Sequence, residues 1–180
     1  MLQEESCYMY YGAIKKNDIA DGPGVRVSLF VSGCRHHCEG CFQPETWNFT
    51  FGRPYTPDTQ KEIIDAMAPG YIKGLTVLGG EPFEPENQKE VAELMKEVKE
   101  RYPEKDIWCY SGYLFDKDMV KGGSVYTEYT DIMLSCIDVL VDGEFVQALK
   151  NLMLKFRGSS NQRLIDVKRS TPENIVLWDE

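Results

Sequence analysis

Three cysteines within eight residues constrain this chain more than any other feature. Cys34, Cys38 and Cys41 follow Val25 to Val31, an apolar, β-branched stretch that predicts a mostly buried strand. Thiols this close in the sequence can converge on one metal centre. A 4Fe-4S cluster held by three thiolates would keep one iron open for a further ligand. The spacing therefore favours an iron-sulfur site at the end of a strand.

Zinc is the main alternative to iron. Both histidines of the chain, His36 and His37, lie inside the cysteine motif. Either could complete a closed, tetrahedral site of three cysteines and one histidine. Zinc and unliganded thiols therefore remain open on spacing alone. The other cysteines stand in apolar or aromatic surroundings that predict buried, unreactive thiols; they are Cys7, Cys109 and Cys136.

Length and charge limit the classes of protein to consider. A chain of 180 residues with 42% hydrophobic content suits a single domain with a core, residues 1–180, in which about 149–180 form a C-terminal extension. The net charge of -9 argues against nucleic acid and anionic membranes as partners. The sequence lacks an apolar run long enough to span a membrane, and its first residues are too polar for a signal peptide. We therefore expect a soluble, cytoplasmic protein.

Strand and helix patterns alternate along the chain. Helix patterns are expected from Thr56 to Ala68, Pro85 to Tyr102 and Glu128 to Cys136. Strand patterns are expected over Cys7 to Ile14, Val25 to Val31, Leu75 to Leu78, Asp106 to Tyr110, Ile137 to Val141 and Leu164 to Val167. Lys15 to Asp18 is expected to turn, and Phe42 to Phe51 to be irregular. The alternation predicts an α/β fold with a mainly parallel sheet, and the chain is too short for a complete barrel. We expect a partial, open (β/α) barrel.

Candidate binding residues follow the expected strands. Gly79-Gly80-Glu81-Pro82 comes directly after one strand, where two glycines admit a ligand to the backbone and Glu81 adds a carboxylate. Taken alone, this tetrapeptide is equally typical of a strand-to-helix turn with a solvated glutamate. Ser111 and Asp142 end the next two strands.

The three cysteines followed by Gly79-Gly80-Glu81-Pro82 resemble the radical S-adenosylmethionine enzymes. The resemblance implies a radical-SAM type barrel in which Cys34, Cys38 and Cys41 hold one 4Fe-4S cluster. Its open iron would chelate the amino and carboxylate groups of S-adenosyl-L-methionine, and the glycine-rich strand end would contact the methionine amino group. Where that family has an aromatic residue, this chain has Gly40, so the backbone there or the following Phe42 would pack against the adenine.

Other stretches are similar to the glycyl-radical-enzyme activases within that family, and in particular to activators of anaerobic ribonucleoside-triphosphate reductase. The stretches are Asp21 to Arg26, Thr46-Trp47, Val139 to Phe145 and Arg157 to Gln162. The resemblance implies that one electron from a low-potential donor, such as a flavodoxin or ferredoxin, cleaves S-adenosylmethionine to methionine and a 5′-deoxyadenosyl radical. That radical would take a hydrogen atom from a backbone glycine of the reductase large subunit. A different glycyl-radical enzyme as target, and a zinc-stabilised binding module without catalysis, are the alternatives.

The resemblance also assigns the site. The residues implied for the cofactor are Gly40, Cys41, Phe42, Gly79, Gly80, Glu81, Ser111 and Asp142, with no protein general base. Related activases carry a lysine two positions after this aspartate, whereas this chain has Glu144. His36 and His37 are expected beside the cluster or at the surface, without binding iron. A basic group is expected to be a solvated face; it comprises Arg157, Arg163, Lys168 and Arg169.

Overall fold

The computed structural model describes residues 9–179, so Cys7 and the first residues of the expected N-terminal strand lie outside the described part. The strands are β1 (Tyr10–Asp18), β2 (Val25–Val31), β3 (Arg53–Pro54), β4 (Ile72–Gly79), β5 (Asp106–Ser111), β6 (Val139–Asp142) and β7 (Arg163–Asp166). The helices are α1 (Pro57–Ala66), α2 (Pro85–Arg101) and α3 (Thr130–Cys136), with 3₁₀ turns η1 (Pro44–Trp47), η2 (Gln147–Leu149) and η3 (Val167–Arg169).

The strands form one sheet in the order β3-β1-β2-β4-β5-β6-β7. Its four central strands, β2, β4, β5 and β6, pair in parallel. The outer strands β1, β3 and β7 pair antiparallel to their neighbours. The α/β class and the parallel centre of the sheet are therefore confirmed, while the antiparallel strands at both margins make the sheet mixed. Barrel curvature stays a prediction.

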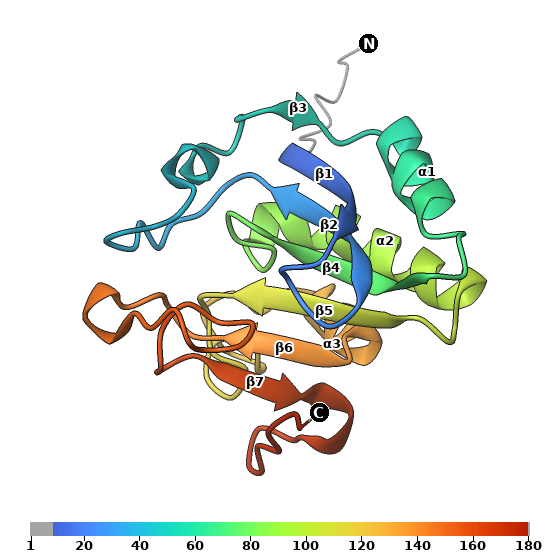
Figure 1. Ribbon diagram of the computed structural model, residues 1–180. Coiled ribbons are helices and arrows are strands. Elements are labelled where there is room, and N and C mark those ends of the chain that lie inside the picture. The colour runs from blue at the N-terminus through green and yellow to red at the C-terminus, as the bar shows by residue number, and fades with distance from the viewer. Residues whose placement is uncertain (1–8, 180) are drawn as a thin grey trace.

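The helices connect the parallel strands. Because the central strands lie in chain order and such crossovers are right-handed, α1, α2 and α3 are expected on a single face. Figure 1 shows α2 and α3 together behind the sheet. The main core fills the space between this face and the helices, with fully buried side chains such as Leu29, Ile63, Leu94 and Met133. The opposite face carries a smaller apolar cluster around Trp108, Val139 and Val141.

The predicted helix signals act as expected. Thr56 caps α1: its hydroxyl accepts from the backbone N–H of Thr59, and the Thr59 hydroxyl accepts in return from the backbone N–H of Thr56. The apolar stripe of α2 is fully buried; it consists of Val91, Leu94, Met95 and Val98. Cys109 and Cys136 are buried as predicted. Local sequence therefore sets where the helices begin and which side they bury.

Three expectations are wrong in detail. Lys15 to Asp18 is the end of β1 rather than a turn, because pairing with β2 continues to Asp18 and its buried carboxylate accepts from Ser28 Oγ at 2.7 Å. The irregular segment from Phe42 contains η1, and just beyond it the two-residue strand β3 was missed because it is too short to show alternation. Arg163 is half-buried rather than part of a solvated face, since its guanidinium pairs with the fully buried Asp142.

Candidate active site

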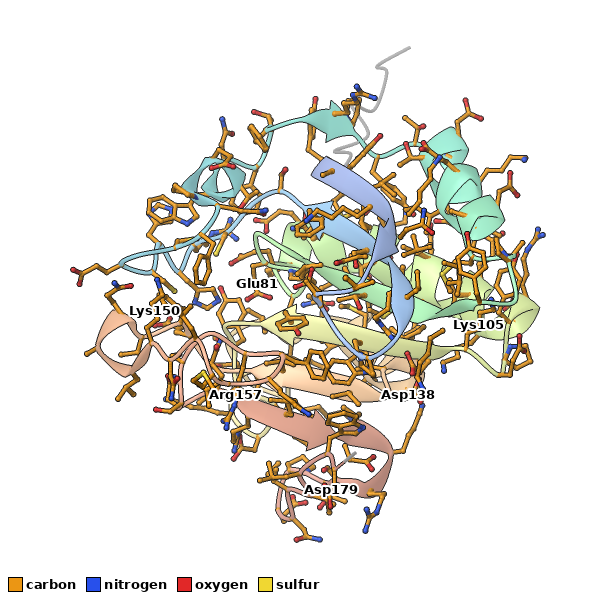
Figure 2. All side chains as sticks on the ribbon, viewed as in Figure 1. Glu81, Lys105, Asp138, Lys150, Arg157 and Asp179 are labelled. Atoms are coloured by element: carbon orange, nitrogen blue, oxygen red, sulfur yellow. The ribbon has the colours of Figure 1, made fainter. Side chains whose placement is uncertain are left out.

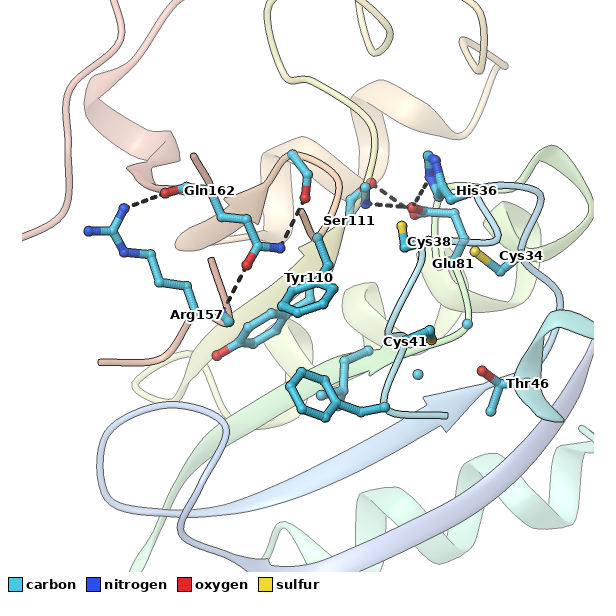
Figure 3. A pocket seen from close by; sticks show the side chains of 18 of the residues that line it. Cys34, His36, Cys38, Cys41, Thr46, Glu81, Tyr110, Ser111, Arg157 and Gln162 are labelled. Atoms are coloured by element: carbon cyan, nitrogen blue, oxygen red, sulfur yellow. Dashed lines mark hydrogen bonds and ion pairs between the residues drawn. The ribbon is translucent and has the colours of Figure 1, made fainter. Parts of the chain in front are cut away.

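A cavity of about 610 Å³ opens at the carboxyl edge of the parallel strands. Its walls come from the cysteine loop after β2, the ends of β4 and β5, and the loop after β6 (Figure 3). The carboxyl ends of parallel strands meet at one edge, which brings these distant segments together. The predicted residues that line the cavity are Cys34, Cys38, Cys41, Phe42, Gly79, Gly80, Glu81 and Ser111. Gly40 and Asp142 directly precede the lining residues Cys41 and Gly143.

All three clustered cysteines reach this cavity as free thiols. Cys34 is buried, and Cys38 and Cys41 are half-buried. Burial, reinforced by the negative charge of Glu81, raises the pKa of the Cys34 thiol to about 12. The thiol is therefore protonated at neutral pH until a metal takes the place of the proton.

The three thiols of the cavity and the two neighbouring histidines are the candidate metal ligands. Among residues 9–179, no three side chains of His, Cys, Asp or Glu come together closely enough to bind one metal ion. A cubane cluster binds each thiolate through a different iron, so its ligands surround a larger volume. Both ring nitrogens of His36 are hydrogen-bonded to carboxylates, and His37 stacks on Trp47 with ring centroids 4.4 Å apart. The histidines thus have other partners, and three thiols around one cavity suit a 4Fe-4S cluster.

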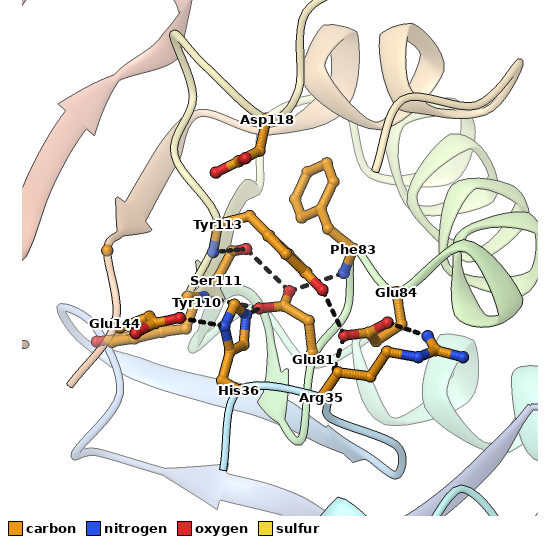
Figure 4. Close-up of polar contacts among 12 residues, drawn as sticks. Arg35, His36, Glu81, Phe83, Glu84, Tyr110, Ser111, Tyr113, Asp118 and Glu144 are labelled. Atoms are coloured by element: carbon orange, nitrogen blue, oxygen red, sulfur yellow. Dashed lines mark hydrogen bonds and ion pairs between the residues drawn. The ribbon is translucent and has the colours of Figure 1, made fainter. Parts of the chain in front are cut away.

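Glu81 is the most tightly bound group of the site. Its fully buried carboxylate accepts four hydrogen bonds (Figure 4). Oε1 accepts from Gly112 N at 2.7 Å and from His36 Nε2 at 2.9 Å. Oε2 accepts from Ser111 Oγ at 2.8 Å and from Phe83 N at 2.9 Å. The glutamate is therefore not solvated, and one function of Ser111 is to orient it.

His36 connects the cysteine loop to two carboxylates. Its Nε2 contacts Glu81, and its Nδ1 lies 2.8 Å from Oε1 of Glu144. Burial alone would lower the pKa of His36, but these carboxylates raise it to about 9, so both ring nitrogens donate at neutral pH. The charge of Glu144 is thus used by His36. We did not predict either contact; the acidic residue after Asp142, where the resemblance to the activases led us to expect lysine, was the available signal.

Arg35 anchors the same loop on the opposite side of His36. Its guanidinium pairs with Glu84 and Glu86 at the start of α2, and Glu84 is fully buried. The hydroxyl of Tyr113 also donates to Glu84, at 2.8 Å. The residues between Cys34 and Cys38 therefore attach the cysteine loop to the sheet edge by ion pairs.

The glycines of the strand end are required by the backbone itself. A Cβ on Gly79, whose φ is +111°, would lie 2.7 Å from the backbone nitrogen and oxygen of Val31. A Cβ on Gly80 would lie 2.7 Å from the carbonyl oxygen of Gly33. The end of β4 therefore lies too close to the end of β2 and the start of the cysteine loop for a side chain at either position. Close packing of two chain segments thus accounts for Gly79-Gly80, in addition to any approach by a ligand.

Asp142 has protein partners. Its buried carboxylate accepts from Arg163 Nε at 2.9 Å, from Arg163 Nη2 at 2.6 Å and from the backbone N–H of Phe115 at 2.9 Å. Arg163 lies opposite Asp142 in the pairing of β6 with β7. The Asp142–Arg163 pair closes the base of the loop between β6 and β7. This loop supplies the outer wall of the cavity.

Residues 20–165 match a family model described as a 4Fe-4S single cluster domain. A protein of Enterobacteria phage T4 is 42% identical over 160 residues, which cover 87% of this chain and 93% of that protein. Proteins of Vibrio cholerae and Escherichia coli K12 are each 40% identical over 147 residues, or 81% of this chain and 90% of theirs. All three are named anaerobic ribonucleoside-triphosphate reductase-activating protein. This chain belongs to that family.

Membership in the activating-protein family agrees with the resemblance noted from the motifs. The 4Fe-4S domain predicted from the cysteine spacing is confirmed by the matching family model, whose range includes Cys34, Cys38 and Cys41. Their individual roles as iron ligands, and those of the cofactor-binding residues, stay predictions. Within residues 9–179, the helices of this family member are too short or too polar to cross a membrane.

Proposed function

We propose that this protein activates anaerobic ribonucleoside-triphosphate reductase by generating a glycyl radical on its large subunit, as a radical S-adenosylmethionine enzyme. One observation carries the proposal: the three clustered thiols and the Gly79-Gly80-Glu81 strand end line the same cavity. The family name of the relatives supports this choice of target over another glycyl-radical enzyme.

Cys34, Cys38 and Cys41 would hold the 4Fe-4S cluster. When bound, cluster and S-adenosylmethionine supply the chemistry: one electron from a low-potential donor, such as a flavodoxin or ferredoxin, splits the cofactor into methionine and a 5′-deoxyadenosyl radical, which takes a hydrogen atom from the target glycine. The protein's part is to bind the cluster and the cofactor, to orient them and to exclude water. Half-buried apolar side chains of the cavity wall suit the exclusion of water; they are Phe145, Leu154 and Phe156.

Glu81 would receive the amino group of the cofactor's methionine. Its carboxylate is oriented beforehand by backbone N–H groups and Ser111, so little reorganisation is needed. All four acceptor positions of the carboxylate are in use, so an incoming ammonium group must replace one donor. His36 is the side-chain donor carried by the cysteine loop, and we expect it to move. Gly40, Phe42 and Asp142 are proposed to complete the binding site for the cofactor.

We infer that the sheet forms a partial, open (β/α) barrel, which would suit this function. The central strands lie in chain order, as barrel strands do, whereas doubly wound sheets reverse their order. The open margins leave room for a protein substrate to reach the strand ends.

Electron paramagnetic resonance tests the proposal. We expect the anaerobically reconstituted, reduced protein to show a cubane signal that changes on addition of S-adenosylmethionine, and a glycyl radical on the purified large subunit. The variant Cys38→Ala should lose the cluster and methionine formation, whereas Cys136→Ala, which removes a thiol outside the cavity, should retain both. Methionine formation by Cys38→Ala at the parent rate would refute the ligand assignment. A colourless preparation that contains zinc would refute the enzymatic function.

A further inference from the structure

The loop between β6 and β7, residues 143–162, ends in an exposed apolar tip. Leu152 and Met153 are 86% and 88% exposed, more than the other exposed large hydrophobic side chains of the described residues. Val146 and Leu149 of the same loop and Phe42 are also exposed large hydrophobic side chains. Phe42 belongs to the cysteine loop and lies against Phe145, with ring centroids 5.3 Å apart. We call Phe42, Val146, Leu149, Leu152 and Met153 the apolar tip. A grouped apolar surface of this kind marks an interaction site.

The apolar tip stands on a well-bonded base. The ion pair of Asp142 and Arg163 closes the loop at its root. Gln162 donates to the carbonyl of Gly143 and accepts from the backbone N–H groups of Gly158 and Ser159. Within the loop, Ser160 N donates to the carbonyl of Leu149 at 3.0 Å. A surface held in place before binding loses less conformational entropy when a partner covers it.

The tip is continuous with the wall of the cavity. Leu152 is part of both, and Leu154 and Phe156 follow it along the wall. Figures 1 and 2 show the cysteine loop and this loop on the same side of the molecule, where the parallel strands end and where Lys150 and Glu81 lie. A protein segment that enters the cavity beside Leu152 would therefore contact this surface.

The charge of the loop differs from that of the whole protein. The chain carries a net charge of -9, yet residues 143–162 contain Lys150, Lys155 and Arg157 and one acidic residue, Glu144, whose carboxylate lies against His36. The ammonium group of Lys150 lies 5.3 Å from the centroid of the Phe42 ring, which places positive charge on the apolar tip itself. The surface complements an apolar segment flanked by carboxylates.

We propose that the apolar tip is the docking surface for the protein substrate, which would cover it with an apolar, acidic face while its glycine enters the cavity. This inference rests on the proposed function for the nature of the partner. It adds the place of contact and the chemistry of the surface that fits it.

The test compares Met153→Asp with Met153→Leu and with Leu177→Asp, a matched change at a 60% exposed leucine outside the tip. Met153 is not a wall residue of the cavity, so methionine formation in the absence of the large subunit should match the parent in all three variants. Binding to the purified large subunit, measured by calorimetry without cofactor, should weaken at least about tenfold for Met153→Asp alone. The yield of glycyl radical should fall in parallel. Circular dichroism checks that each variant is folded.

Parent-like binding by Met153→Asp would overturn the docking surface. So would a parent that dimerises through this face and becomes monomeric with Met153→Asp, since the occupant would then be a second copy of the chain. Binding is measured separately from cofactor cleavage. A parent protein that fails to cleave S-adenosylmethionine therefore refutes the proposed function, whereas the binding data still decide the docking surface.

Discussion

The two sides of the cavity are built on opposite principles. On the side of the cysteine loop, Glu81 and Glu84 are completely buried charges, and hydrogen bonds and ion pairs satisfy them. On the side of the β6–β7 loop, Leu152 and Met153 are almost completely exposed apolar side chains. Buried charges require hydrogen-bond or ion-pair partners, and these partners fix the geometry of the site. Exposed apolar side chains contribute favourable free energy only when a partner covers them. The polar side is suited to hold permanently bound groups, and the apolar side to contact a binding partner.

The largest effect on stability is expected at the base of the β6–β7 loop, which resembles the polar side rather than the tip. Arg163→Met would leave the Asp142 carboxylate buried without its counter-ion, which should lower the free energy of unfolding by about 3–5 kcal/mol. Urea titration measures the change. Arg169→Met is the control, because that exposed arginine only approaches Asp166 at 4.0 Å. Equal unfolding midpoints for the two variants would show that the base is not structurally important.

A smaller cost is expected for Glu81→Gln. The amide nitrogen would face hydrogen-bond donors such as Phe83 N–H or Gly112 N–H, and unsatisfied groups of this kind cost about 1–3 kcal/mol. Denaturant unfolding without cofactor reports this directly. Glu86→Gln changes an exposed carboxylate at the start of α2 and should cost less than about 1 kcal/mol. If both substitutions cost the same, the polar side would not be the preformed site described above.

The pH dependence of the folding stability should show that the polar side extends to the β1–β2 turn, where Asp21 lines the cavity. Burial, together with the neighbouring carboxyl group of Asp18, raises the pKa of Asp21 from 3.8 to about 7. The folded protein then binds more protons than the unfolded chain between these values, so the contribution of Asp21 to stability falls as pH rises from about 4 to about 7. Asp21→Asn should flatten that part of the stability profile in urea titrations at several pH values. An unchanged slope would contradict the raised pKa.

The smallest effect is expected at the apolar tip. Met153→Ser removes a side chain that is 88% exposed and should change the free energy of unfolding by no more than about 0.5 kcal/mol. The same variant should still bind the large subunit more weakly than the parent. A loss of stability above about 1 kcal/mol would mean that the tip packs within the protein, and the contrast between the two sides would then fail.

Much of the fold could be predicted because its signals are local. The cap at Thr56, the apolar stripe of α2 and the β-branched run of β2 each depend on neighbouring residues, and all three were identified. The short strand β3 was missed, since two residues carry no alternation and its place depends on pairing with Tyr10 and Tyr11. The extension of β1 to Asp18 was missed for the same reason: a partner strand stabilises residues that look like a turn.

The sequence by itself determined the chemistry available at the site: the clustered thiols, the glycine-rich strand end and the acidic residue within it. Only the tertiary structure decided how these groups are connected. His36 meets Glu144 across 108 positions and Glu81 across 45, and Arg163 meets Asp142 across 21. Such contacts depend on strand order and register, which follow from packing the whole sheet, whereas local patterns carry only the preference of each segment.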